Sequence, residues 1–381
     1  MSNKKLLKVL CLGRFCDDEP GGTQTHVETL FQALNTKVDF VNLVPARTAK
    51  SDVVECAGVK TYRMAGFRLE SSVYLSPLMV WKLWRLNRKH RFDVVHLHFP
   101  DPMSHLASML LPRRVARVIT WHSDILRQKT LLSLYRPFLV AAVRRAQAVI
   151  VPTPAHVSSS EVLASLKDEL RLHIVPFGFD FSALLSSKNP HPAKPQGDRR
   201  FTIFALGRHV YYKGFDVLIR AVAQMDRQVR LVLGGDGPLS PYLKNLSVEL
   251  AVEDKVHFTG RIADEELGGY YASCDVFCLP AVARTEAFGI VQVEAMAFGK
   301  AVVSTRLENG VDYVNRHEDT GLLAEPGNLE SLIQCLERLQ FDEELRHRLG
   351  ERGRQKALVE YSLSNMGKLT LEAYEIAVGL A

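Results

Sequence analysis

The 381-residue sequence predicts an α/β protein built from two doubly wound domains in succession. Short runs of Val, Ile and Leu alternate with segments of helical apolar spacing, which is typical of strand–helix units around a parallel sheet. The alternation stops over residues 176–200, where Pro190, Pro192, Pro195 and Gly197 lie in polar sequence, and then restarts. A chain of this length also exceeds one ordinary domain. We therefore expect two domains that face each other across a ligand cleft.

The N-terminal half contains the first set of strand and helix signals. Lys8 interrupts the short apolar run at the start of the chain, so that run predicts a buried strand and not a signal peptide. The first helix shows apolar spacing through Val27, Leu30, Phe31 and Leu34. The expected strands are residues 6–12, 38–43, 59–63, 93–98, 117–122 and 148–152, and the expected helices are residues 25–34 and 78–87.

The C-terminal half repeats the pattern. The expected strands are residues 201–206, 229–233, 255–259, 275–280 and 300–304, and the expected helices are residues 216–225, 240–250, 264–272, 289–298 and 329–340. A final helix at about residues 365–378 is compatible with packing on either domain.

Charge is unevenly distributed along the chain. The net charge is +6, but residues 1–180 hold 25 Lys and Arg against 15 Asp and Glu. A basic half favours an anionic partner, either a phosphate-bearing substrate or a membrane surface. Nucleic acid fits less well, because no recognised base-reading motif accompanies the basic residues.

A basic amphipathic segment at residues 81–91 sharpens the membrane hypothesis. Trp81 and Trp84 alternate there with Lys and Arg, and a helix of this kind docks on anionic lipid. A solvated helix face is the alternative interpretation. Further arginines that we expect on this surface are Arg113, Arg114, Arg117, Arg144 and Arg145.

Cysteine and histidine spacing argues against disulfide and metal sites. The six cysteines form no CxxC pair, so we expect a reducing, cytoplasmic compartment, with Cys274 and Cys278 as buried thiols. His96 and His98 share one strand, but no third ligand is evident. No Asp-x-Asp pair is present to hold a divalent cation on a diphosphate. No apolar run approaches the roughly 18 residues that span a bilayer.

Residues 284–300 are the most informative stretch. Glu286 lies in a loop before Phe288 and Gly289, and Glu294 lies eight positions later in a helix expected to begin near Gly289. Free N–H groups and the positive dipole end make a helix start a phosphate site. The arrangement suits a ligand with a diphosphate between two hydroxyl-bearing ends, which describes a nucleotide sugar. Two carboxylates on an ordinary helix are the alternative.

Three other segments carry candidate ligand residues. Arg208 and Lys213 lie between a strand and a helix, where they would neutralise a diphosphate or remain solvated loop charges. Gly21 and Gly22 open the first helix, either to let the backbone approach a phosphate or as a tight turn. His122 ends a strand, where both a site role and a structural role are open.

In order and separation, these residues resemble retaining glycosyltransferases of the GT-B fold, in particular glycosyltransferase family 4. The resemblance is most specific at the Glu286-to-Glu294 spacing around Phe288 and Gly289. The other segments that carry it are Gly207-Arg208, Lys213-Gly214, Gly235-Asp236-Gly237-Pro238, Phe258-Thr259-Gly260 and Gly321-Leu322-Leu323.

The resemblance implies a role for each matching residue. Arg208 and Lys213 would bind the diphosphate, Glu294 the ribose, and Glu286 the sugar hydroxyls. His122 would lie near the reacting sugar carbon. The remaining donor-binding residues would be Phe288, Gly289 and Ile290 through backbone N–H groups, Arg261 and Ile262 at the base, and the Gly21-Gly22 turn.

The resemblance also implies the domain division and the acceptor class. Residues 1–177 with the last helix, 363–381, would form the acceptor domain, and residues 178–362 the donor domain. Where many members have a Gly-Gly-x-x-Glu turn, residues 307–315 differ. That variant resembles transferases that build bacterial surface polysaccharide, some of which use GDP-mannose or related donors.

The expected function is therefore transfer of a hexosyl group, with retention, from a nucleotide sugar to a glycan or lipid-linked acceptor. No metal and no further cofactor is expected. The alternatives are a UDP-sugar-dependent transferase, a nucleotide-sugar 2-epimerase or hydrolase of the same fold, a glycogen-phosphorylase-like enzyme, and a noncatalytic binding protein.

Overall fold

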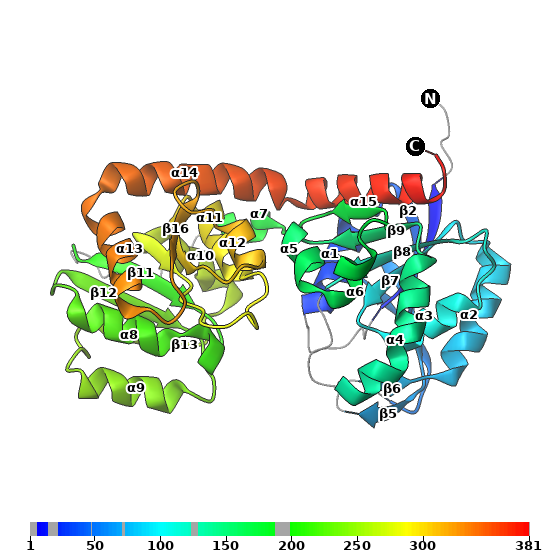
Figure 1. Ribbon diagram of the computed structural model, residues 1–381, viewed down its shortest axis with the longest axis horizontal. Helices are drawn as coiled ribbons and strands as arrows, with labels where there is room; N and C mark the ends of the chain where they lie inside the picture. The colour runs from blue at the N-terminus through cyan, green and yellow to red at the C-terminus, as the bar shows by residue number, and fades with distance from the viewer. Residues whose placement is uncertain are drawn as a thin grey trace. The chain divides into compact units, whose positions relative to one another are not determined.

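The computed structural model describes residues 6–13, 22–46, 48–70, 73–122, 129–186 and 199–380 (Figure 1). The chain divides into two compact units. The N-terminal unit comprises Met1–Phe179 with Leu363–Ala381, and the C-terminal unit comprises Asp180–Ser362. Each unit is an α/β domain built on a mainly parallel sheet, so the predicted fold class is confirmed.

The N-terminal unit contains an eight-stranded sheet in the order β10-β9-β8-β7-β1-β2-β4-β3. All neighbouring strands are parallel except β3 and β4. The strands are β1 (Leu7–Leu12), β2 (Val38–Pro45), β3 (Asp52–Cys56), β4 (Val59–Met64), β7 (Val94–Phe99), β8 (Ala116–Trp121), β9 (Ala148–Val151) and β10 (Leu172–Ile174). A separate antiparallel pair is formed by β5 (Phe67–Glu70) and β6 (Val73–Leu75).

Helices cover this sheet on two sides, and a separate apolar core lies against each face. They are α1 (Gly22–Leu34), α2 (Pro77–His90), α3 (Pro102–Met109), α4 (Lys129–Arg144), α5 (Pro154–Ser159), α6 (Glu161–Leu166) and α15 (Leu363–Ala377). The last helix, α15, packs against α1 (Figure 1). Its Tyr374 is fully buried in the core with Met366 and Ala373, so the end of the chain belongs to the N-terminal unit.

The C-terminal unit contains a six-stranded parallel sheet in the order β13-β12-β11-β14-β15-β16. The strands are β11 (Phe201–Leu206), β12 (Val229–Gly234), β13 (Val256–Gly260), β14 (Val276–Cys278), β15 (Ala301–Thr305) and β16 (Gly321–Ala324). The helices are α7 (Phe181–Leu185), α8 (Phe215–Gln224), α9 (Ser240–Glu249), α10 (Asp264–Ser273), α11 (Ile290–Ala297), α12 (Gly310–Val314), α13 (Leu329–Phe341) and α14 (Glu343–Glu360), with a 3-10 turn, η1 (Tyr211–Lys213).

Strand order reverses once in each sheet. In the N-terminal unit the chain proceeds from β1 to β2 on one side and later adds β7 on the other, and in the C-terminal unit β11 lies between β12 and β14. Doubly wound proteins bind ligands beyond the carboxyl ends of the strands at such a reversal. The segments that follow β1, β7 and β8, and those that follow β11 and β14, are therefore where ligands are expected.

The thiols are mostly buried. Cys11, Cys274 and Cys278 are free and buried, as predicted for the last two, and Cys335 is free and partly buried. Burial raises the pKa of the Cys11 and Cys278 thiols well above the ordinary value. Cys56 is disulfide-bonded, which the cysteine spacing did not predict. Across the described residues, no helix combines the length and apolarity needed to cross a bilayer.

Candidate functional site

The segments that follow β11, β12 and β13 are joined by backbone hydrogen bonds. Gly207 N–H donates to Gly234 O at 3.2 Å, and Gly235 N–H donates to Gly260 O at 2.7 Å. Gly235 has φ +105°, and a Cβ there would lie 2.0 Å from Gly207 O. Only glycine fits this approach. Arg208 therefore follows a closely packed glycine segment at the carboxyl end of the central strand β11, and its side chain is exposed.

Lys213 is the last residue of η1, in the segment that follows β11, and its side chain is buried. Gly214 follows in the left-handed region at φ +66°, and a Cβ there would lie 2.1 Å from Pro280 O. Tyr212 O also accepts from Val282 N–H at 2.9 Å. The segment after β11 is thus fixed to the segment after β14 on the other side of the strand-order reversal.

The Glu286 carboxylate meets the Lys213 ammonium at this reversal. Glu286 Oε2 lies 2.6 Å from Lys213 Nζ, and the two side chains are only 12% and 11% exposed. An ion pair so withheld from water is weakly screened. Tyr212 lies near enough to Arg208 and Glu286 to feel both charges. Burial raises the pKa of Tyr212, the negative charge of Glu286 raises this pKa further, and the positive charge of Arg208 lowers it. The structure thus brings together three of the predicted catalytic residues.

Helix α11 begins where the sequence predicts. Its N-cap is Gly289, which has φ +71° and no room for a Cβ, since that atom would lie 2.5 Å from Leu279 Cδ2. Phe288 is buried before the cap, and Ile290 is the first helical residue and is exposed. The N–H groups at a helix start of this kind are able to bind an anion.

Glu294 lies on α11 with its carboxylate bonded to a residue of α10. Tyr271 OH donates to Glu294 Oε2 at 2.6 Å. Burial raises the pKa of Glu294, the Tyr271 hydrogen bond lowers it, and the charge of Asp264 raises it again. One carboxylate oxygen is therefore held by the protein, and the other has no hydrogen bond among those described. A ribose hydroxyl is a suitable donor to that oxygen.

The divergent segment at residues 307–315 contacts the backbone of the loop that carries Glu286. Asn309 Nδ2 donates to Glu286 O at 2.7 Å, and Asn309 Oδ1 accepts from Val311 N–H at 2.9 Å as the N-cap of α12. A Cβ on Gly310 would lie 2.3 Å from Ala287 O. This segment is a buttress for the Glu286 loop, a role that the sequence comparison with the usual turn does not reveal.

Asn309→Ala tests this buttress. We expect a loss of about 1–2 kcal/mol in stability, from the helix cap and the bond to Glu286, together with a roughly tenfold loss of kcat/KM. The matched control is Asn328→Ala. Asn328 caps α13 by accepting from Ser331 N–H at 2.9 Å, so it should cost similar stability in a denaturant titration and leave turnover unchanged. Equal effects of both variants on turnover would show that Asn309 only stabilises the fold.

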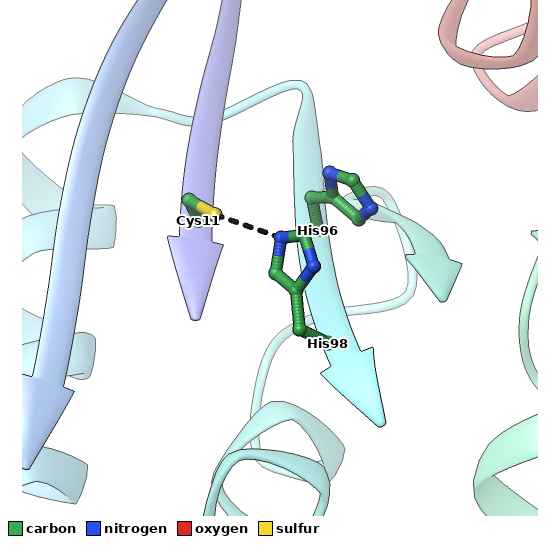
Figure 2. A group of neighbouring side chains, drawn as sticks. All are labelled: Cys11, His96 and His98. Atoms are coloured by element: carbon green, nitrogen blue, oxygen red, sulfur yellow. Dashed lines mark hydrogen bonds between the residues drawn. The ribbon is translucent and has the colours of Figure 1, made fainter. Parts of the chain in front are cut away.

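The N-terminal unit holds His122 within a group of histidines. His122 Nε2 and His98 Nδ1 are hydrogen-bonded at 3.0 Å, and the His122 ring stacks on Phe177 with centroids 5.9 Å apart. Figure 2 shows Cys11 on the neighbouring strand reaching the His98 ring, with Sγ 3.2 Å from His98 Nε2. His26, on α1, places its ring centroid 4.9 Å from that of His122.

The other predicted residues are distributed between the two units. Arg261 and Ile262 directly follow β13, and a Cβ on Gly234 would lie 2.7 Å from Ile262 Cδ1. Gly22 is the first residue of α1, while Gly21 lies outside the described residues. Arg208, Lys213, Glu286, Phe288, Gly289, Ile290, Glu294, Arg261 and Ile262 belong to the C-terminal unit, and His122 belongs to the N-terminal unit.

The residues that contact the predicted site residues and fix their positions were not predicted from the sequence. Tyr271, Asn309, Cys11 and His26 carry no motif of their own, and each acts through a partner distant in the chain. Only the strand pairing of β1, β7 and β8 could have grouped Cys11 with the histidines.

Two family descriptions match the chain. Residues 20–182 match "Glycosyltransferase Family 4", and residues 187–356 match "Glycosyl transferases group 1".

Named relatives agree with these matches. The chain is 32% identical over 247 residues to the D-rhamnosyltransferase WbpZ of Pseudomonas aeruginosa, an alignment that covers 64% of this chain and 63% of the relative. It is 28% identical over 270 residues to the O-antigen chain mannosyltransferase C of Escherichia coli, covering 70% and 71%. The crystal structure of Anabaena HepE in complex with UDP has a TM-score of 0.74 at 21% identity, covering 96% of this chain and 99% of HepE, which shows a shared GT-B fold.

Proposed function

Because the chain belongs to the GT-B glycosyltransferases, with a family 4 segment followed by a group 1 segment, we propose that it transfers a hexosyl group from a nucleotide sugar. The acceptor is a glycan or lipid-linked glycan in polysaccharide or glycolipid assembly, and anomeric configuration is retained. The observation that carries the proposal is the buried Lys213–Glu286 pair beside the start of α11.

The charges of this site suit a nucleotide sugar better than a simple phosphate. Lys213, Arg208 and the α11 N-terminus supply positive charge for a diphosphate. Glu286 and Glu294 supply carboxylate acceptors for sugar and ribose hydroxyls. As the glycosidic bond breaks, negative charge grows on the departing diphosphate, and preorganised cations stabilise it more than they stabilise the ground state. The diphosphate in turn assists deprotonation of the acceptor hydroxyl.

We propose a GDP-sugar of the mannose type as the donor, which the mannosyl- and rhamnosyltransferase relatives favour. A UDP-sugar is the second candidate, since HepE was crystallised with UDP. Thermal unfolding in the presence of GDP, UDP and ADP separates them. A ligand at 100 times its Kd stabilises the native state by about 2.7 kcal/mol, so we expect the largest rise in melting temperature with GDP. A larger rise with UDP would reverse the choice of base.

Product analysis distinguishes a transferase from its alternatives. With labelled GDP-mannose and a glycan acceptor we expect the label in a new α-glycosidic linkage, whereas a hydrolase gives free sugar and a 2-epimerase gives an altered sugar without acceptor. We also propose that the donor needs no divalent cation, so EDTA should not lower turnover. Loss of turnover in EDTA that Mg²⁺ restores would contradict this part of the proposal.

We further propose that α2 docks on anionic membrane, where a lipid-linked acceptor is presented. Trp81 and Trp84 are 51% and 52% exposed, beside Leu78 at 49%. The Arg85 guanidinium lies 4.7 Å from the centroid of the Trp81 ring, and the Arg88 guanidinium lies 4.7 Å from that of the Trp84 ring. Interfacial Trp with basic neighbours is typical of membrane-surface helices. Arg117 does not belong to this surface: it is buried, and its guanidinium donates to Val115 O, Ser108 O and Leu111 O.

Flotation with liposomes tests the α2 proposal. The protein should float with vesicles containing anionic lipid at low salt and dissociate as salt screens the attraction. Trp81→Ser with Trp84→Ser should abolish flotation. Phe341→Ser removes another exposed aromatic, 73% exposed in the C-terminal unit, and should have no effect. Absence of flotation at low salt would support the solvated-helix interpretation.

A further inference from the structure

Three histidines of the N-terminal unit converge beside the reversal of strand order. His26 comes from α1, His98 from β7, and His122 follows β8. One ring nitrogen of each lies within 4.8 Å of the others. The group was not predictable from the sequence, because His98 was paired there with His96, His122 was considered separately, and His26 carried no signal.

The spacing of two of these nitrogens already matches a shared metal ion. His98 Nδ1 and His122 Nε2 lie 3.0 Å apart. Two imidazole nitrogens bound at about 2.0–2.1 Å to one tetrahedral Zn²⁺ are separated by about 3.3 Å, close to this distance. A shared ion would replace this hydrogen bond with two metal bonds.

His26 supplies an independent indication of a ligand. Its side chain is only 9% exposed, and its Nδ1 is buried with no hydrogen-bond partner among the described residues. Buried polar atoms without a partner are rare and costly. The His26 ring is T-shaped to the rings of both His98 and His122, so a cation among the three rings would lie beside this imidazole.

The surroundings of the three rings also resemble those of a metal site. His98 Nε2 bonds to Cys11 Sγ at 3.2 Å (Figure 2), leaving Nδ1 to face His122. Such an outer bond fixes the orientation of a ligating imidazole. His96 is excluded as a ligand, because its two ring nitrogens bond to Thr120 Oγ1 and Tyr374 OH, each at 2.7 Å.

We propose that His26, His98 and His122 form a three-histidine site for a divalent transition-metal ion such as Zn²⁺, Co²⁺ or Ni²⁺. Imidazole suits these ions, whereas Mg²⁺ and Ca²⁺ need oxygen ligands, and no carboxylate belongs to this group among the described residues. His122 is the least buried of the three histidines. One consequence rests on the proposed function: if His122 acts in glycosyl transfer, an ion bound to it inhibits the enzyme.

Titration of the metal-free, full-length protein with Co²⁺ tests the site without any substrate. We expect one equivalent to bind, with the visible absorption of a low-coordinate ion and without a thiolate charge-transfer band, because Cys11 is an outer partner. His26→Gln should weaken binding by at least about 100-fold. Cys11→Ser should weaken it by about 10-fold, in the range for outer-shell changes.

Controls separate ligation from unfolding. His105→Gln replaces another buried histidine of this unit, bonded to Tyr135 and outside both histidine groups, and should retain full Co²⁺ binding. His122→Gln alters a less buried ligand and should lose binding, which keeps the proposal testable if His26→Gln does not fold. Unchanged binding in either ligand variant, no binding by the unaltered protein, or a thiolate band lost in Cys11→Ser would each overturn the three-histidine assignment.

Discussion

Lys213→Ala is expected to lower kcat by about 10²–10³-fold, the loss seen when one preorganised donor to a developing negative charge is removed. The same change leaves the Glu286 carboxylate buried without its partner, 2.6 Å away in the native chain. Removing one member of a buried ion pair costs about 3–5 kcal/mol. The free energy of unfolding from denaturant titration should therefore fall together with turnover.

The double variant Lys213→Ala with Glu286→Gln separates these two effects. A neutral amide relieves the unpaired charge, so much of the lost stability should return while turnover stays low. Lys255→Ala is the control for burial, because Lys255 is 7% exposed and donates to two backbone carbonyls, Val222 O and Met225 O. It should lose stability but keep the turnover of its folded fraction. Near-normal turnover of folded Lys213→Ala would refute the proposed role of Lys213 at the diphosphate.

Many of the strands and helices with clear periodicity are predictable from sequence, but the apolar helix α4 and the buried strand β16 were not predicted. The α11 start was predicted to within one residue, because Gly289 is a required left-handed cap. By contrast α14, at Glu343–Glu360, was missed. Its composition is strongly polar, and Gly350 and Gly353 are poor helix formers. The structure explains the first of them, because a Cβ on Gly350 would lie 2.1 Å from Gly299 O.

The candidate site was predictable where residues lie in one segment. Glu286, Gly289 and Glu294 share one loop and helix, so their spacing carries the signal. Arg208 and Lys213 were found because segments after parallel strands meet at one edge of the sheet. The hydrogen bonds from Tyr271 to Glu294 and from Asn309 to Glu286 span 23 positions each. Such pairs form only when the chain folds, and the spacing of residues in one sequence does not show which distant residues will be in contact.

Glu294→Gln should weaken GDP binding by roughly 10–100-fold. In the native chain one carboxylate oxygen accepts from Tyr271 OH at 2.6 Å, which directs the other toward a ribose hydroxyl in the proposed complex. A hydrogen bond to a charged group contributes about 1.5–3 kcal/mol, and about 1.4 kcal/mol corresponds to a tenfold change in Kd. The measurement is calorimetric titration with GDP, and turnover at saturating donor should change less than KM.

The pH dependence of GDP binding gives a second test, because it depends on the same carboxylate. Burial raises the pKa of Glu294 and the Tyr271 hydrogen bond lowers it. Only the ionised carboxylate accepts with full strength, so affinity should fall on acidification at a higher pH than an ordinary Glu would give. Tyr271→Phe removes the lowering contribution, so the fall should move to still higher pH. Glu294→Gln has no proton to gain and should show no such fall, and a fall that persists in this variant would assign the titration to another group.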